Sequence, residues 1–131
     1  LRAMLESYGA ARAARRITPE GIAELRQLAE DQYHETVAKP EGYLERVGVL
    51  NSQFHRRIHE FAGSPRLVTA LASLIEAPLM LRTFATYQDE DLSRSASHHL
   101  EIVRALEAHD GEWCAALMRA HVLGARGTLA N

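Results

Sequence analysis

Apolar residues recur every three or four positions along most of this chain, and no useful length alternates between apolar and polar residues as a strand does. The three-to-four period places side chains on one face of an α-helix. It is clearest between residues 44 and 62, where one face carries Val47, Leu50, Phe54, Ile58 and Phe61. Each such helix needs another to cover its apolar face, so the sequence predicts an all-α antiparallel bundle.

Capping residues and prolines divide the chain into helices. Thr18-Pro19 and Ser64-Pro65 each join a capping side chain to the residue tolerated at the first helical position, and Lys39-Pro40 ends one helix and begins the next. The acidic stretch 88–91 is predicted as a loop, followed by a helix capped by Ser93 or Ser95 and by another capped by Asp110. The six predicted helices cover residues 2–15, 19–38, 40–63, 65–87, 93–109 and 111–126.

The same spacing assigns inner faces to the first and last helices. In the first, the expected inner face carries Leu1, Met4, Leu5, Tyr8 and Ala11. In the last, it carries Trp113, Ala116, Leu117, Ala120 and Gly124. These assignments rest on helical spacing alone.

The composition is that of one soluble globular domain, with 131 residues of which 47% are hydrophobic and 24% charged. No apolar run approaches the roughly 20 residues that span a bilayer, and no signal-peptide pattern opens the chain, so we predict a cytoplasmic protein. The lone Cys114 excludes an internal disulfide and fits a reducing compartment. The start at Leu1, inside a helical pattern, predicts a fragment of a longer chain.

Charge gives no sign of a nucleic-acid partner for this piece. The 15 Lys and Arg residues are dispersed among 17 Asp and Glu residues, and the formal net charge is −2. A surface that binds the phosphate backbone needs clustered positive charge. We therefore expect no DNA binding by this chain alone.

Three histidines lean toward a common interior from three predicted helices: His55, His99 and His121. Asn51 lies one turn before His55 and points the same way. Imidazole nitrogens with one oxygen donor suit zinc or nickel and accept manganese or iron. These four residues are the predicted metal site. The alternative is that the histidines are ordinary core residues with satisfied hydrogen bonds.

The remaining histidines have no such inward direction. His59 is also one turn from His55, but it lies about 140° from the centre of the apolar face and is predicted to face solvent. His34 and His109 are likewise predicted to be solvated.

Arg82 is the other charged residue on a predicted inner face, and it follows Pro78 by one turn. A guanidinium can hold a carboxylate through two parallel hydrogen bonds. Pro78 should bend the helix and could widen a cavity there. The alternatives are an internal ion pair or a side chain that reaches solvent for Arg82, and a simple kink for Pro78.

The motifs together resemble the FCD domain, the carboxy-terminal effector-binding domain of FadR-subfamily GntR-type transcription regulators. The resemblance covers nearly the whole chain. Its motifs are Arg2-x-x-Leu5-Glu6 with Ala13-Ala14, Asn51-x-x-Phe54-His55-x-x-Ile58, Ala62-Gly-Ser-Pro-Arg-Leu67, His99-x-x-Ile102 with Ala105-Leu and Asp110, and Met118-Arg-Ala-His121.

This resemblance implies a bundle of six or seven helices around a central cavity that binds a small organic acid. Residues 1–131 would be the effector-binding and dimerisation domain of a homodimer. Its occupancy would be transmitted to an amino-terminal winged helix-turn-helix domain, absent from this sequence, through which alone the protein would bind DNA. Activation and repression of DNA binding are equally open.

In the metal-binding members of that family, an Asp and three His hold a divalent ion, and the effector's carboxylate can complete its shell. The histidines correspond to His55, His99 and His121, and Asn51 stands at the Asp position. A neutral amide should lower metal affinity and leave more positive charge to attract an anionic effector. Zinc is the predicted ion, and Arg82 and Arg2 are the predicted effector contacts.

A metal-dependent hydrolase and a helical interaction module without metal are the alternative functions. Three histidines with an open metal position can activate water. However, Glu101 and Glu107 are predicted to face outward, and Cys114 has no activating partner in the sequence. We therefore predict that the chain is not an enzyme.

Overall fold

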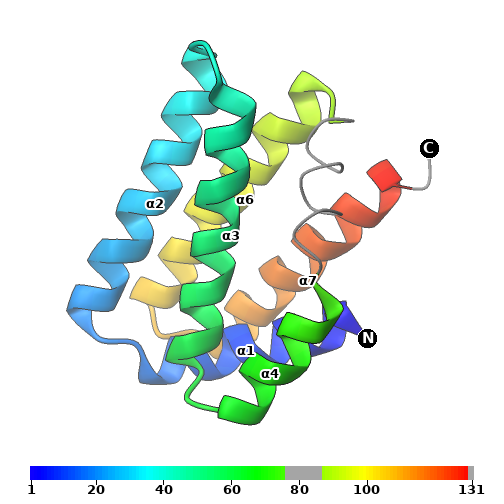
Figure 1. Ribbon diagram of the computed structural model, residues 1–131. Helices are drawn as coiled ribbons and strands as arrows, with labels where there is room; N and C mark the ends of the chain where they lie inside the picture. The colour runs from blue at the N-terminus through cyan, green and yellow to red at the C-terminus, as the bar shows by residue number, and fades with distance from the viewer. Residues whose placement is uncertain (76–86, 130–131) are drawn as a thin grey trace.

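The structure is a computed structural model that describes residues 1–75 and 87–129, and these residues form helices with no strand among them. Figure 1 shows the bundle that the helices build. The helices are α1 (Arg2–Arg16), α2 (Pro19–Ala38), α3 (Tyr43–Phe61), α4 (Pro65–Leu74), α6 (Asp89–Glu107) and α7 (Gly111–Leu129). The predicted all-α fold is confirmed. Within the described residues, no helix is both long and apolar enough to cross a membrane.

Two antiparallel helix pairs form the body of the bundle, and α1 crosses beneath them (Figure 1). Helix α2 packs against both α3 and α6, and α6 packs against α7. Helix α1 has its most extensive contacts with α7 and also touches α3, α4 and α6. The interior between α1, α3, α6 and α7 is therefore lined from four different segments of the chain.

Three of the predicted helix starts are confirmed by their caps. The Thr18 hydroxyl oxygen accepts a hydrogen bond from the Gly21 amide at 3.1 Å. The Ser64 hydroxyl accepts from the Leu67 amide at 3.3 Å, and the Asp110 carboxylate accepts from the Trp113 amide at 3.0 Å. Each cap satisfies an amide that the first turn leaves without a helical partner.

Three predicted boundaries are wrong. Helix α3 begins at Tyr43, after Gly42, and not at Pro40. Helix α4 ends at Leu74 instead of reaching residue 87, because Ile75 has an extended backbone with φ −107° and ψ 103°. Arg82 and Pro78, which the sequence placed on that helix, lie outside the described residues. The acidic stretch 88–91 belongs to α6, where Gln88 and Asp91 form a reciprocal capping box and the acidic first turn complements the helix dipole.

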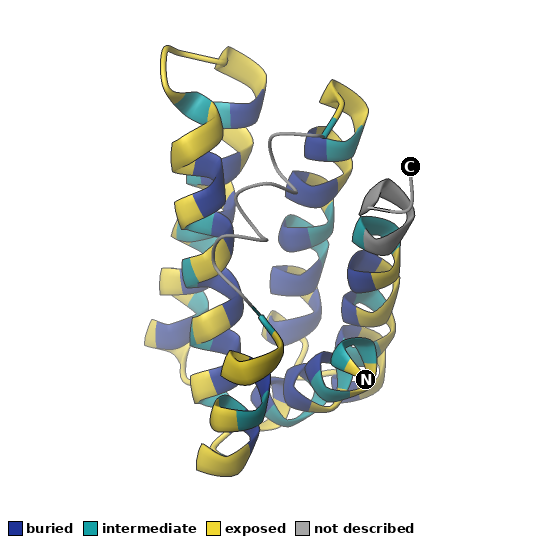
Figure 2. Ribbon diagram, turned by 45° about the vertical axis from the view of Figure 1, so that its right-hand side comes forward, coloured by how far each residue is buried: buried dark blue, intermediate teal, exposed yellow. Residues whose placement is uncertain are grey.

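The inner faces predicted for the first and last helices are only partly buried (Figure 2). Leu5 and Leu117 pack against the core, but most of the other residues on these faces are exposed. Helix α1 buries Glu6, Gly9, Ala10, Ala13 and Ala14, whereas Met4 and Tyr8 on the helix and Leu1 before it are exposed. Helix α7 buries Cys114, Met118, His121 and Val122, and Trp113, Ala116 and Ala120 are exposed. Small side chains let α1 approach its neighbours closely: a Cβ atom added at Gly9 would lie 3.0 Å from Cδ2 of Leu67. Close approach therefore decides which face is buried.

Two methionines provide a matched test of this packing. Met118 on α7 is fully buried in the core, whereas Met4 on α1 is 65% exposed. We expect Met118→Ala to lower the free energy of unfolding by about 2–5 kcal/mol, through lost burial and a residual cavity. Met4→Ala should change it by no more than about 0.5 kcal/mol. Urea denaturation followed by circular dichroism measures both, and similar losses would contradict the observed orientation of α1.

Candidate metal centre

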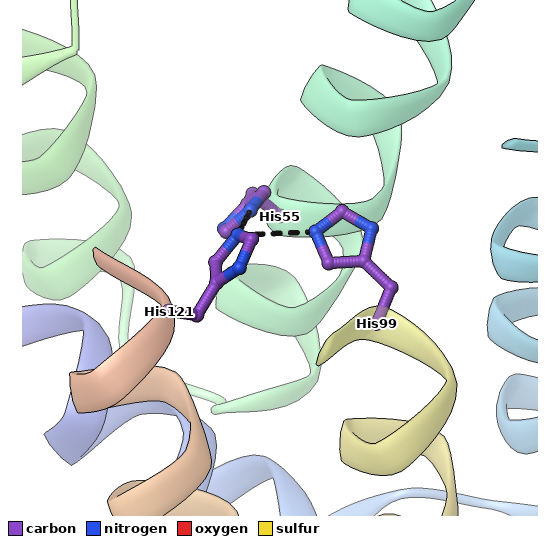
Figure 3. A group of neighbouring side chains, drawn as sticks. All are labelled: His55, His99 and His121. Carbon is purple, nitrogen blue, oxygen red and sulfur yellow. Dashed lines mark hydrogen bonds between the residues drawn. The ribbon is translucent and has the colours of Figure 1, made fainter. Parts of the chain in front are cut away.

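Three imidazole rings meet in the interior, one each from α3, α6 and α7 (Figure 3). Nε2 of His121 lies 3.1 Å from Nε2 of His55 and 3.2 Å from Nε2 of His99. The exposed fractions are 3% for His55, 0% for His99 and 8% for His121. The structure therefore brings together the three histidines that the sequence selected.

Packing holds these rings in place. The ring of Phe54 stacks on that of His99, with centroids 4.1 Å apart and an angle of 11° between the planes. His55 and His121 lie nearly parallel, with centroids 5.1 Å apart. Because Phe54 is the residue before His55 on α3, one short segment supplies both a nitrogen and the surface that orients a second ring.

Hydrogen bonds alone do not satisfy this cluster. An imidazole nitrogen carries in the ring plane either one proton or one lone pair. Nε2 of His121 has two ring nitrogens as near neighbours, so it can donate to one or accept from one, but not complete both contacts. No assignment of protons satisfies both.

The spacing fits nitrogen ligands around one ion. Zinc lies about 2.0–2.1 Å from histidine nitrogen, so two ligands at a tetrahedral angle are about 3.3–3.4 Å apart, and at a right angle about 2.9 Å. The two nitrogen–nitrogen distances at His121 fall between these values. The ligand atoms of all three histidines lie within 4.8 Å of one another. The donor set therefore fits a divalent ion.

The environment also favours the neutral imidazole, which is the form that binds metal. Burial lowers the pKa of His99 well below its ordinary value, and the neighbouring His121 and His55 add to this effect. Burial lowers the pKa of His121 in the same way, followed by the influence of His55 and His98. Both rings therefore present a lone pair at neutral pH.

Glu6 is the residue of the candidate site that sequence reasoning missed. Its side chain is fully buried on α1, and Oε1 accepts hydrogen bonds from Nδ1 of His55 at 2.8 Å and from Nε2 of His59 at 3.1 Å. Oε2 accepts from Nε of Arg2 at 2.6 Å. Burial by itself raises the pKa of Glu6, but His55, His59 and Arg2 outweigh it and hold this pKa well below the usual value.

The prediction that His59 faces solvent is wrong. His59 is 5% exposed and donates to Glu6, because α1 crosses α3 and covers the flank that a single-helix projection leaves open. Glu6, His55 and His59 also form a second group with metal-ligand spacing. His34 and His109 are exposed, as predicted.

The outer nitrogens of the other two rings differ in their partners. Nδ1 of His121 lies 3.2 Å from Nδ1 of His98, a half-buried residue that precedes His99 on α6. Nδ1 of His99 is buried and has no hydrogen-bond partner. Of these three rings, His55 is the one whose outer nitrogen, Nδ1, contacts a carboxylate, that of Glu6.

Burial and helix position describe the other predicted site residues, Asn51 and Arg2, and the cysteine. Asn51 is 3% exposed and lies one turn before His55 on α3. The Arg2 side chain is 29% exposed and is bound to Glu6. Burial raises the pKa of Cys114 to about 12, so its thiol stays protonated at neutral pH and is unsuited to nucleophilic attack.

Comparison with known proteins identifies relatives of the whole bundle. The family model of the FCD domain matches residues 1–124. The structure of E. coli McbR/YncC is similar, with a TM-score of 0.79 and 21% sequence identity, over 98% of this chain and 62% of that chain. At this identity the likeness shows the fold, and this chain spans less than two thirds of that protein. No curated protein matches the sequence.

The lowered histidine pKa values predict acid sensitivity of the metal-free protein. Unfolding releases His99 and His121 to an ordinary pKa of about 6.5, so below that pH the unfolded state binds more protons and stability falls. With chelator present, the free energy of unfolding should fall as the pH drops below about 6.5, by at most about 1.4 kcal/mol per pH unit for each such ring.

Urea titrations at pH 7.5 and 5.5 measure this dependence. His99→Gln, which removes one titrating ring, should weaken it. The exposed His34→Gln provides the control and should leave it unchanged. A metal-free protein that is equally stable at both pH values would show that these rings are not buried in the neutral form.

Proposed function

Because the chain belongs to the FCD domain family, we propose that it is the ligand-sensing domain of a FadR-subfamily GntR-type transcription regulator. In this proposal residues 1–131 bind one divalent metal ion and a small carboxylate effector. They also form a homodimer and act on DNA only through a separate amino-terminal domain. The working location of such a regulator is the cytoplasm.

The proposal of metal binding rests on one observation, the close approach of Nε2 of His121 to a buried ring nitrogen of His55 and to one of His99. The nitrogen of His121 has two neighbours at 3.1 and 3.2 Å and can satisfy only one of them with a proton. A cation at the common centre would accept all three lone pairs at once. His55, His99 and His121 would hold it, and the Asn51 side-chain oxygen would add a neutral donor.

Zinc is the proposed ion, since it takes imidazole and oxygen ligands readily; nickel, manganese and iron are the alternatives. When bound, it supplies positive charge that attracts an anionic effector. Arg2 would bind the effector's carboxylate with the guanidinium nitrogens that do not contact Glu6. Arg82 is the second proposed anchor and lies outside the described residues.

The chemistry of the described residues favours sensing over catalysis. A hydrolase needs a general base beside the activated water. The buried carboxylate nearest the histidines, Glu6, already accepts three hydrogen bonds, and the Cys114 thiol is protonated at neutral pH. Turnover of a carboxylate by the metal-loaded protein would favour the hydrolase alternative.

Metal binding is tested on protein purified without added metal. We expect elemental analysis and zinc titration calorimetry to give one ion per chain. His55→Ala and His121→Ala should each lower the affinity by at least about 100-fold, because each removes a ligand. His34→Ala removes an exposed histidine and should have no effect. Metal retained by both ligand variants would contradict this site.

Effector binding is tested by calorimetry of the zinc-loaded protein against small mono- and dicarboxylic acids. We expect at least one acid to bind, with affinity at least about 10-fold weaker after zinc removal, since its carboxylate interacts with the ion. Arg2→Gln should weaken binding by about 10-fold or more, the effect of one lost charged hydrogen bond. Arg56→Gln, at an arginine whose side chain is 65% exposed, is the control. Binding of no acid, with or without zinc, would favour the interaction module.

A further inference from the structure

We infer that Glu6 is the positioning residue of the proposed metal centre, orienting His55 through its outer nitrogen and supplying negative charge that Asn51 does not. This inference rests on the proposed metal function. Its structural part, the contact between Glu6 and His55, can also be tested in metal-free protein. No side chain among the candidate ligands carries a negative charge, since three are imidazoles and one is an amide.

Glu6 contacts the ring nitrogen of His55 that does not face His121. Its Oε1 accepts from Nδ1 of His55, whereas Nε2 of His55 faces His121. A neutral imidazole with its proton on Nδ1 has a free lone pair on Nε2. Glu6 therefore selects the tautomer that directs a lone pair toward the centre of the cluster. Metal-binding histidines are commonly oriented by a carboxylate in this way.

Three donors keep Glu6 ionised and fixed. Arg2 binds Oε2, and His55 and His59 both bind Oε1. Hydrogen bonds donated to a carboxylate favour its ionised form, so three of them keep the negative charge on Glu6. His59 therefore acts on Glu6 as a second fixed donor, one turn after His55 on α3.

The charge of Glu6 is not cancelled by its partner Arg2. The Glu6 side chain is 0% exposed and the Arg2 side chain is 29% exposed. Solvent screens the charge of the guanidinium more strongly than that of the buried carboxylate. The two charges together therefore give a negative electrostatic potential at His55. This field strengthens the donor character of the imidazole and partly offsets a dipositive ion.

A second ion held by Glu6, His55 and His59 is the competing interpretation of the same group. The contacts of Glu6 with His55 at 2.8 Å and with His59 at 3.1 Å are ordinary hydrogen bonds, so this group needs no ion to satisfy it. The cluster of three histidines differs, because its contacts cannot all be hydrogen bonds at once. The Arg2 guanidinium lies 2.6 Å from the other oxygen of Glu6 and would repel a cation there. The geometry therefore favours one ion with Glu6 outside its ligand shell.

Glu6→Gln tests the charge with little change of shape. We expect zinc affinity, measured by competition with a chromophoric chelator, to fall by about 10–100-fold. The absorption spectrum of bound Co²⁺ should shift as the donor strength of His55 falls. Asn51→Asp should raise the affinity and, combined with Glu6→Gln, restore much of the loss. The control is Glu35→Gln, which removes another arginine-paired carboxylate, bound to Arg46.

Nitrogen NMR of metal-free protein at pH 8 separates this inference from the proposed function. His55 protonated on Nδ1 in the wild type, with that preference lost in Glu6→Gln, supports the positioning role whether or not zinc binds. Failure of the wild type to bind zinc would overturn the metal function alone. An Nε2-protonated His55, unchanged zinc affinity in Glu6→Gln, or two ions per chain would overturn the role of Glu6.

Discussion

The buried contact between Glu6 on α1 and His55 on α3 is the interaction on which the site depends. An ionised carboxylate in a protein interior is tolerated only when charged or polar partners satisfy it. Glu6 receives its hydrogen bonds from α1 itself through Arg2 and from α3 through His55 and His59. The path of α1 across the bundle is therefore fixed by polar contacts as well as by apolar packing.

That path requires small residues around Glu6. Gly9, Ala10, Ala13 and Ala14 share the buried face, and they allow the backbone of α1 to approach α7, α3 and α4 closely enough to bring Glu6 to the histidines. A larger residue in this face would crowd α4, since a Cβ added at Gly9 would lie 3.0 Å from Cδ2 of Leu67. The same requirement leaves Met4 and Tyr8 exposed.

Local signals were sufficient for much of the fold. The caps at Thr18, Ser64 and Asp110 depend on neighbouring residues only, and all three were predicted correctly. The inward direction of His55 and His99 follows from helix faces with many apolar residues, whereas His121 lies on the flank of a predicted face whose residues are mostly exposed. The face of α1 could not be predicted in this way, because hydrophobicity favours Leu1 and Met4 whereas tertiary packing favours glycine and alanine. His59 and Glu6 were missed for the same reason: each is buried by the other's helix.

The arrangement also links the two ligands of the proposed sensor. Arg2 contacts Glu6, which contacts His55, so a carboxylate bound to the remaining nitrogens of Arg2 would change the electrostatic potential at the proposed metal-binding nitrogen. Linkage is reciprocal: if the effector alters metal affinity by some factor, the metal alters effector affinity by the same factor. Arg2 and Glu6 both lie on α1, so the proposed link between the two ligands passes through side chains of the first helix. Under the proposed function, a ligand shifts the protein between two arrangements only to the extent that it binds them with different affinity.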